Sequence, residues 1–217
     1  MAQAVKNIDL WKKVLDNIPT SYKSWFEDEK KFLHKHITKN AQILEVGCGD
    51  GRSIKDVLDI TKNIAAIDHD LKAVDDAINN FKNYPSIKIV LADAKNIPFK
   101  DETFDFILCL TTFANFADNK YKILEEMKRV LKKDGKIIIS VFSEDAFEER
   151  MKVYKNIPST IKKVIDNRTV IFEGSGEDIV SEQFSQDELK KIFETVNLKI
   201  DSIQKSGIGY ICKLKIE

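Results

Sequence analysis

Three glycines at alternate positions, Gly47, Gly49 and Gly51, follow the short apolar run QILEV at residues 42–46. Glycine adopts backbone conformations that other residues avoid, and it lets a ligand approach the main chain closely. A helix expected from about Ser53 would point its first amide groups at the same place. A strand, a glycine turn and a helix in this order predict a nucleotide site, although glycine turns also occur where nothing binds.

The spacing of the turn and the charges around it indicate which nucleotide fits. A dinucleotide site follows the pattern G-x-G-x-x-G/A, whose third small residue lets helix and strand pack closely. Counted from Gly47, that position holds Arg52, which is too large. The carboxylates of Glu45 and Asp50 flank the turn, so they would repel a pyrophosphate and attract a sulfonium that also carries an ammonium group. The charges therefore favour S-adenosylmethionine over NAD.

Two more acidic residues follow the next two apolar runs. Asp68 ends NIAAID at 63–68, and Asp93 comes directly after IKIVLA at 87–92. Each alone is explained equally well as an ordinary loop residue. Together with Glu45 they place acids at three successive strand ends, on the edge where open α/β sheets bind ligands. A shared role in hydrogen bonding to one ligand is the simpler interpretation.

The elements that position these groups alternate regularly from residue 42 onward. Apolar residues recur at helical spacing over 71–81, after the second strand. The fourth strand, at 104–110, precedes a helix with apolar residues over 123–131. A turn at 133–135 then leads into a fifth strand at 136–142. Nearly continuous apolar strands separated by helices indicate a parallel sheet covered on both faces.

The C-terminal part completes the sheet. Ser185 and Glu188 form a capping box that opens a helix. Two final strands, at 198–204 and 209–216, are joined by only four residues and must therefore be antiparallel. We expect an α/β fold with a Rossmann-like, doubly wound sheet of seven strands. The sheet is mostly parallel with an antiparallel last strand, and helices cover both faces.

Two segments stand outside this alternation. Residues 1–40 have helical spacing broken at Pro19, which predicts an N-terminal helical cap. Residues 143–182 are highly charged, and we expect a lid-like insertion with a helix at about 145–165 and an irregular or hairpin segment. The aromatic residues Tyr22, Trp25 and Phe26 fit a lid over the ligand and plain core packing equally well.

The run ILEVGCGDG at 43–51 resembles motif I of the class I S-adenosylmethionine-dependent methyltransferases, an acidic residue followed by GxGxG. The match continues in register through most of the chain. It implies a methyltransferase domain over 41–217, closest to the small-molecule and quinone methyltransferase group. It implies that Asp68 binds the ribose hydroxyls, that Asp93 and the Ala94 amide contact adenine, and that His69 lines the adenine. The cofactor-binding residues expected in all are Glu45, Gly47, Cys48, Gly49, Gly51, Asp68, His69, Asp93, Ala94, Leu110 and Tyr22.

The chain departs from the family pattern at two turns away from this pocket. Asp134-Gly135 replaces the usual Pro-Gly or Gly-Gly before the fifth strand. Asn197 replaces the usual glycine before the sixth strand. Asparagine is the non-glycine residue that best tolerates a left-handed cap, so we expect the helix end to survive.

The methyl acceptor is poorly marked. After the fourth strand the chain reads Cys109-Leu-Thr-Thr-Phe113, without the Asp/Asn-Pro-Pro-aromatic signature of enzymes that methylate base amines. No catalytic residue is predicted, because holding nucleophile and methyl group in line can supply much of the acceleration. The leading hypothesis is transfer to nitrogen, oxygen or carbon of a small molecule. Alternatives are an RNA or protein acceptor, or a non-catalytic cofactor-binding regulatory subunit. An RNA acceptor would need a basic face, such as one formed by Lys120, Lys122, Lys128, Arg129, Lys132 and Lys133.

Composition narrows the remaining classes. Lys plus Arg and Asp plus Glu both number 35, so the formal charge is zero and we do not expect nucleic-acid binding. Three cysteines lie far apart, so neither a disulfide nor a metal site is expected. The first residues lack the apolar core of a signal peptide and no apolar run approaches about 18 residues, so we expect neither a signal peptide nor a membrane span. We expect a cytoplasmic monomer or homodimer with no membrane span.

Overall fold

A seven-stranded sheet forms the centre of the protein, whose structure is a computed structural model that describes residues 7–15, 18–155, 160–174 and 177–217. Its strands are β1 (Ile43–Val46), β2 (Ile64–Asp68), β3 (Lys88–Leu91), β4 (Phe104–Leu110), β5 (Leu131–Phe142), β9 (Leu198–Ser206) and β10 (Gly209–Ile216). The order is β3-β2-β1-β4-β5-β10-β9. The first five strands are parallel, and β10 runs antiparallel to both neighbours. The predicted fold class is therefore confirmed.

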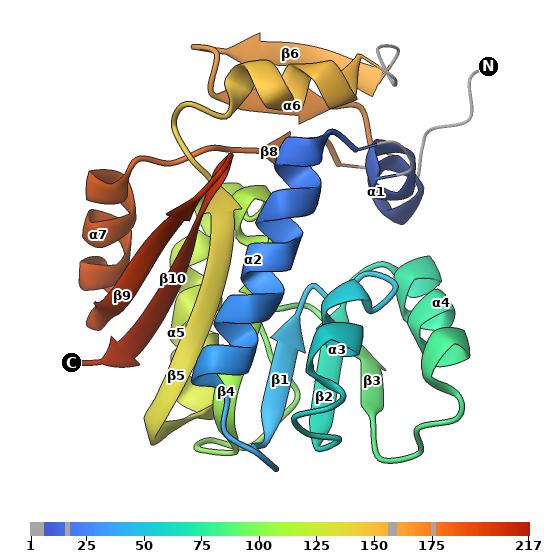
Figure 1. The fold of residues 1–217 in the computed structure, drawn as a ribbon, viewed down its shortest axis with the longest axis vertical. Coiled ribbons are helices and arrows are strands. Elements are labelled where there is room, and N and C mark those ends of the chain that lie inside the picture. The colour runs from blue at the N-terminus through green and yellow to red at the C-terminus, as the bar shows by residue number, and fades with distance from the viewer. Residues whose placement is uncertain (1–6, 16–17, 156–159, 175–176) are drawn as a thin grey trace.

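Helices cover both faces of this sheet (Figure 1). They are α2 (Thr20–His36), α3 (Arg52–Val57), α4 (Leu71–Phe81), α5 (Lys120–Val130) and α7 (Gln186–Thr195). On one face, apolar residues of α2, α3 and the end of α4 share a core with β1 and β2. On the other face, α5 and α7 pack against side chains of β4, β5 and β10. The alternation of buried strands and amphipathic helices produces this layering, because each helix has one apolar stripe to bury.

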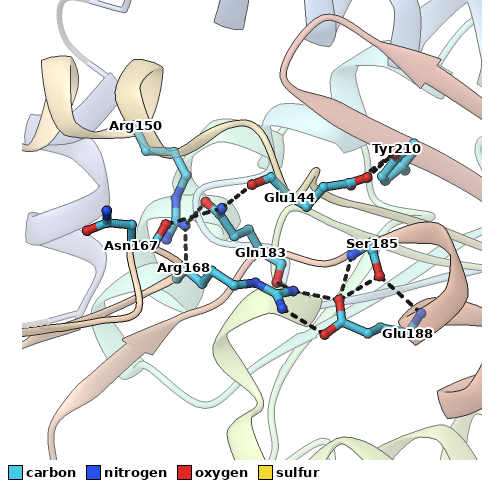
Figure 2. A network of polar contacts seen from close by, with 8 residues as sticks. All are labelled: Glu144, Arg150, Asn167, Arg168, Gln183, Ser185, Glu188 and Tyr210. Atoms are coloured by element: carbon cyan, nitrogen blue, oxygen red, sulfur yellow. Dashed lines mark hydrogen bonds and ion pairs between the residues drawn. The ribbon is translucent and has the colours of Figure 1, made fainter.

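A second layer of short elements lies beyond the carboxyl ends of the parallel strands (Figure 1). It contains α1 (Asn7–Leu15), α6 (Phe147–Tyr154), the 3₁₀ helices η1 (Phe113–Asn115) and η2 (Ala117–Asn119), and strands β6 (Ile161–Ile165), β7 (Thr169–Phe172) and β8 (Ile179–Ser181). The three strands form a separate antiparallel sheet. A polar network around Arg150 of α6 joins this sheet to the segment that leads into α7 (Figure 2).

The helix expected at about 145–165 is too long. In the structure α6 ends at Tyr154, and residues 161–165 are strand β6; residues 156–159 lie outside the described part. Asp166 and Asn167 both adopt positive φ, 49° and 51°, which is the conformation of a tight hairpin turn. The turn therefore allows β6 to pair with β7, and residues 161–165 form a strand of this hairpin in place of the expected helix.

The turn expected at 133–135 lies within β5, which is assigned from Leu131 to Phe142. It takes the form of a bulge: Phe104 of β4 pairs with Leu131 and Phe106 with Lys136, so residues 132–135 leave the ladder. Two local predictions are confirmed. Ser185 and Glu188 form a capping box, and Asn197 has φ 55° at the end of α7.

Candidate functional site

A cavity of about 1080 Å³ lies at the carboxyl edge of the large sheet. The glycine turn after β1, the ends of β2 and β3 and the loop after β4 form one side. Parts of α1, α2 and the segment around β8 form the other. Ten of the eleven predicted residues line this cavity: Glu45, Gly47, Cys48, Gly49, Asp68, His69, Asp93, Ala94, Leu110 and Tyr22. The structure therefore brings together residues that are up to 88 positions apart in the chain (Tyr22 to Leu110).

The eleventh predicted residue, Gly51, serves packing instead. A Cβ atom at Gly51 would lie 2.2 Å from the ring of Phe81 in α4, and its φ is +89°. Gly47 and Gly49 also have positive φ, 76° and 55°. All three glycines are thus required by the backbone, but only Gly47 and Gly49 face the cavity.

Asp68 holds the glycine turn in place. Its Oδ2 accepts a hydrogen bond from the Gly49 amide at 2.9 Å, and its Oδ1 accepts one from the Asp70 amide at 3.0 Å. Asp70 in turn caps α4, because its side chain accepts from two amides of the first turn. The Asp68 side chain is 11% exposed, so it faces the cavity while anchored at both oxygens.

Glu45 is a buried carboxylate on the wall of the cavity. Ser53 donates a hydrogen bond to its Oε1, and its Oε2 has no hydrogen-bond partner among the described residues. Burial raises the pKa of Glu45 to about 7, against the opposing effects of Ser53 and Arg52. A cationic ligand would compensate this carboxylate.

The charged residues around the cavity are unbalanced. Among the residues that the structure describes, eight carboxylates line it: Glu45, Asp50, Asp68, Asp70, Asp75, Asp93, Glu177 and Asp178. The four permanent cations on the same wall each contact a carboxylate: Lys12 and Lys72 with Asp76, Arg52 with Glu29, and Lys95 with Asp93. The excess of negative charge suits a ligand with sulfonium and ammonium groups and opposes a pyrophosphate.

Asp93 and His69 lie at the open side of the cavity. The Asp93 side chain is 55% exposed, and its Oδ1 accepts from the Lys95 amide at 2.8 Å. The His69 side chain is 69% exposed, with Nδ1 3.6 Å from Asp68. Both are accessible to a ligand, in contrast to Leu110, which is buried at the base of the cavity.

Aromatic side chains form the far end of the cavity. Tyr22 and Trp25 of α2 are almost fully buried and contact Phe142 at centroid distances of 5.9 and 5.1 Å. Both belong to the core and also line the cavity, so the two interpretations of these aromatics are compatible. Burial holds the pKa of Tyr22 well above its usual value.

Several wall residues were missed by sequence reasoning. Trp11, Thr111, Thr112, Asn115, Phe116 and Phe142 line the cavity. None is marked by a motif, because α1, η1 and the end of β5 meet only through the tertiary fold. The histidines of α2 lie elsewhere: His34 contacts the Asp56 carbonyl at 2.8 Å, and His36 lies 3.1 Å from Lys213.

The three cysteines are free and buried. Burial raises the pKa of each thiol, and the carboxylates of Glu45 and Asp68 raise that of Cys48 further. Cys48 lies on the cavity wall between Gly47 and Gly49. Within the described ranges, no cluster of side chains could hold a metal ion, and no helix is long and apolar enough to cross a membrane.

Comparisons with known proteins agree with this geometry. The profile of a family described as "Methyltransferase domain" matches residues 44–139. An uncharacterized protein of Methanocaldococcus jannaschii is 36% identical over 162 residues, covering 69% of this chain and 71% of that protein. A demethylmenaquinone methyltransferase of Renibacterium salmoninarum is 29% identical over 128 residues, covering 59% and 52%. A crystal structure of a SAM dependent methyltransferase from Aquifex aeolicus has a TM-score of 0.69 at 20% identity, covering 95% of this chain and 98% of that one.

The matched region contains the glycine turn, Asp68, Asp93 and β4, which all contribute residues to the wall of the cavity. The unpartnered Glu45 oxygen and the carboxylate-rich wall fit a cationic adenosyl compound. The seven-stranded sheet with its antiparallel β10 is shared with the solved methyltransferase. The chain therefore belongs to the class I S-adenosylmethionine-dependent methyltransferases, enzymes that take their methyl group from S-adenosylmethionine.

Proposed function

We propose that this methyltransferase acts on a small molecule, at nitrogen, oxygen or carbon. The observation that carries the proposal is the size and cover of the cavity. At about 1080 Å³ it exceeds the roughly 300–1,000 Å³ of pockets that hold one drug-sized ligand. It has room for the methyl donor and a second small molecule, and α1 and the segment around β8 form walls on its far side.

The cofactor side of the cavity is proposed to hold S-adenosylmethionine as follows. Gly47, Cys48 and Gly49 let the ligand approach the backbone, and Glu45 compensates its positive charge. Asp68 and His69 bind the ribose and the nearby edge of the base, and Asp93 with Ala94 binds adenine. Leu110 and Tyr22 pack against the ligand from the base and the far wall. We also propose that residues 1–40 act as a helical cap and 143–182 as a lid-like insertion over the methyltransferase domain.

The donor supplies a methyl group bonded to a sulfonium, which is already activated for displacement. An electron pair of the acceptor, a lone pair on nitrogen or oxygen or the carbanionic pair of an activated carbon, would form the new bond to the methyl carbon while the carbon–sulfur bond breaks and its electron pair stays on sulfur. Any proton of the acceptor leaves to water or to a carboxylate of the wall. The protein contributes by aligning the two molecules and by excluding water with the aromatic end of the cavity.

The basic residues needed for an RNA acceptor are largely neutralised. Lys120 contacts Glu182 at 3.0 Å, Lys128 contacts Glu125 at 2.9 Å, and Lys132 contacts Asp105 at 2.7 Å. Arg129 contacts both Asp101 and Glu126. These pairs support the small-molecule proposal over an RNA acceptor. The relative named for demethylmenaquinone gives further support.

The test is a single-turnover screen of purified protein with S-adenosylmethionine, scored by S-adenosylhomocysteine. Small-molecule extracts, RNA and denatured protein serve as separate acceptor pools. Product is expected with a small-molecule pool, and retention on immobilised RNA is expected to be absent at 150 mM salt. Turnover confined to RNA or protein would contradict the proposal.

A further inference from the structure

A chain of hydrogen bonds runs from a buried carboxylate of α2 to the backbone of the cavity wall. Glu29 is 1% exposed. Its Oε1 accepts from Ser140 Oγ of β5 at 2.5 Å, and that oxygen accepts from the Thr111 amide at 2.9 Å. The other oxygen of Glu29 lies 3.0 Å from the Arg52 guanidinium of α3. One carboxylate of α2 thus connects the loop after β4, through Ser140, with Arg52 at the start of α3.

Thr111 at the end of this chain has an unfavourable backbone conformation. Its φ is +63°, in the left-handed region that β-branched residues rarely occupy. Such a strained backbone persists only where surrounding contacts impose it. Here the amide is held by both the hydroxyl and the carbonyl of Ser140. Strain at a residue that lines the cavity points to a role in the site.

The hydroxyl groups of Thr111 and Thr112 each donate their hydrogen atom to a backbone carbonyl. Thr111 Oγ1 donates to the Leu110 carbonyl at 2.6 Å, and Thr112 Oγ1 donates to the Gly47 carbonyl at 3.0 Å. A carbonyl oxygen can only accept, so each hydroxyl offers only lone pairs to other groups. This part of the wall therefore presents hydrogen-bond acceptors beside the glycine turn.

The fold alone gives little reason for a buried Glu29. Burial raises the pKa of its carboxyl, even though Arg52 and Ser140 oppose that shift. Replacing a buried ion pair with apolar residues is often neutral or stabilising. A buried carboxylate that fixes a strained loop on the cavity wall is better explained by its effect on the loop.

We propose that Glu29 and Ser140 are positioning residues for methyl transfer. By holding the Thr111 amide, they fix the backbone conformation of Thr111 and Thr112. The lone pairs of both threonine hydroxyls then face the position where methyl donor and acceptor meet. The proposal rests on the cofactor placement given under Proposed function, and it does not depend on the nature of the acceptor.

The test compares two ligands by calorimetry. S-Adenosylhomocysteine lacks the transferred methyl group, whereas sinefungin carries an amine at that position, which can donate hydrogen bonds to the threonine oxygens. The wild type is expected to bind sinefungin at least 10-fold more tightly. Ser140→Ala is expected to reduce this preference at least 5-fold, while the affinity for S-adenosylhomocysteine changes less than 3-fold.

Two further variants keep the test independent of a folding defect. Ser143→Ala removes another fully buried hydroxyl, which bonds to Asp145, and should retain the preference. Glu29→Gln keeps an oxygen for Ser140 and should retain it within 2-fold, whereas Glu29→Leu should behave like Ser140→Ala. In amide-exchange NMR, the Thr111 amide should exchange at least 10-fold faster in Ser140→Ala than in the wild type.

Each other outcome is decisive. An intact preference in both Ser140→Ala and Glu29→Leu overturns the positioning role and leaves the cofactor site in place. A wild type that binds S-adenosylhomocysteine without preferring sinefungin overturns the lone-pair assignment. Failure of the wild type to bind either ligand overturns the cofactor placement and this inference with it. The small-molecule proposal is judged separately, by the acceptor screen.

Discussion

Asp68 uses both of its oxygens within the protein before any ligand arrives. They accept from the Gly49 and Asp70 amides, and each carboxylate oxygen has a further lone pair for a ligand hydroxyl. The residue therefore orders the turn and, in the proposed placement of the cofactor, would offer acceptors to the ribose at the same time.

Replacing Asp68 with alanine is expected to weaken S-adenosylmethionine binding at least 10-fold in calorimetry. Two amides lose their acceptor, and one negative charge leaves the wall. Asp59→Ala is the matched control, because Asp59 is exposed and lies near His34, outside the cavity. Equal affinities for Asp68→Ala and the wild type would contradict the assigned role.

Glu45 should make binding depend on pH. Its pKa is raised to about 7 by burial, and a cationic ligand favours its ionised form. Affinity should therefore be about 10-fold weaker at pH 6 than at pH 8 from this group alone. The ligand's own amine also titrates, so the measured quantity is the difference between the wild type and Glu45→Gln. Parallel pH profiles for the two proteins would refute the prediction.

The raised pKa of Glu45 also makes the free energy of unfolding depend on pH. In the unfolded chain Glu45 ionises near its usual pKa of 4.5, whereas in the fold it ionises only near 7. The folded state binds the extra proton between these values, so this group's contribution to stability is present below pH 4.5 and is lost as the pH rises to 7. Glu45→Gln should therefore gain stability relative to the wild type as the pH rises from 5 to 8, by roughly 1–3 kcal/mol in urea titrations. A constant difference across this range would contradict the shift.

At the scale of elements, Gly51 sets how closely the loop before α3 approaches α4. A methyl group there would overlap the ring of Phe81, and the backbone is left-handed as well. Gly207 is a useful comparison, because it is also left-handed (φ +52°) but its Cβ would meet nothing closer than 3.5 Å.

Gly51→Ala is expected to cost about 2–4 kcal/mol of unfolding free energy, and Gly207→Ala about 1–2 kcal/mol. The difference measures the contact with Phe81, since both variants share the backbone penalty. Thermal or urea denaturation is sufficient. Equal losses in the two variants would show that Phe81 moves aside without cost.

Elements were predictable from sequence where the signal is local. The capping box at Ser185 and the left-handed Asn197 follow from residue type alone. A hairpin segment was expected within 143–182, but strand β6 was assigned to the helix before it, because charged residues at 162 and 163 mask the strand pattern. The bulge at 132–135 depends on register with β4, which no local pattern encodes.

At the scale of the molecule, Arg150 holds parts of the 143–182 segment together and joins them to Gln183 (Figure 2). Its fully buried guanidinium donates to the carbonyls of Arg168 and Ser181 and to Gln183 Oε1, at 2.7–2.8 Å. Gln183 then donates to the Glu144 carbonyl at 2.6 Å. These hydrogen bonds join α6, the three-stranded sheet and the segment before α7.

Arg150→Met should lower the unfolding free energy by about 2–4 kcal/mol, because several buried acceptors lose their donor. Hydrogen exchange should accelerate first in strands β6 to β8. Arg129→Met removes an arginine that pairs with Asp101 and Glu126 near the surface and should cost no more than about 1 kcal/mol. Uniform exchange across the chain in Arg150→Met would contradict a local role.

The sheet and the cofactor side of the site were predictable, since glycines, acids and apolar strands follow one another in sequence. On the other half of the cavity, only the aromatic residues of α2 were predictable. Trp11, Asn115 and Phe142 come from three distant segments with no shared motif, and only tertiary packing places them on one wall. The relay from Glu29 to Thr111 spans 82 positions and was invisible for the same reason.

Cys48 places a sulfur atom on the wall of a cavity that receives an alkylating agent. Only a thiolate attacks carbon readily, and burial together with Glu45 and Asp68 keeps this sulfur protonated. In the proposed placement of the donor, the carboxylates that would attract it would thus also keep the Cys48 thiol from being methylated.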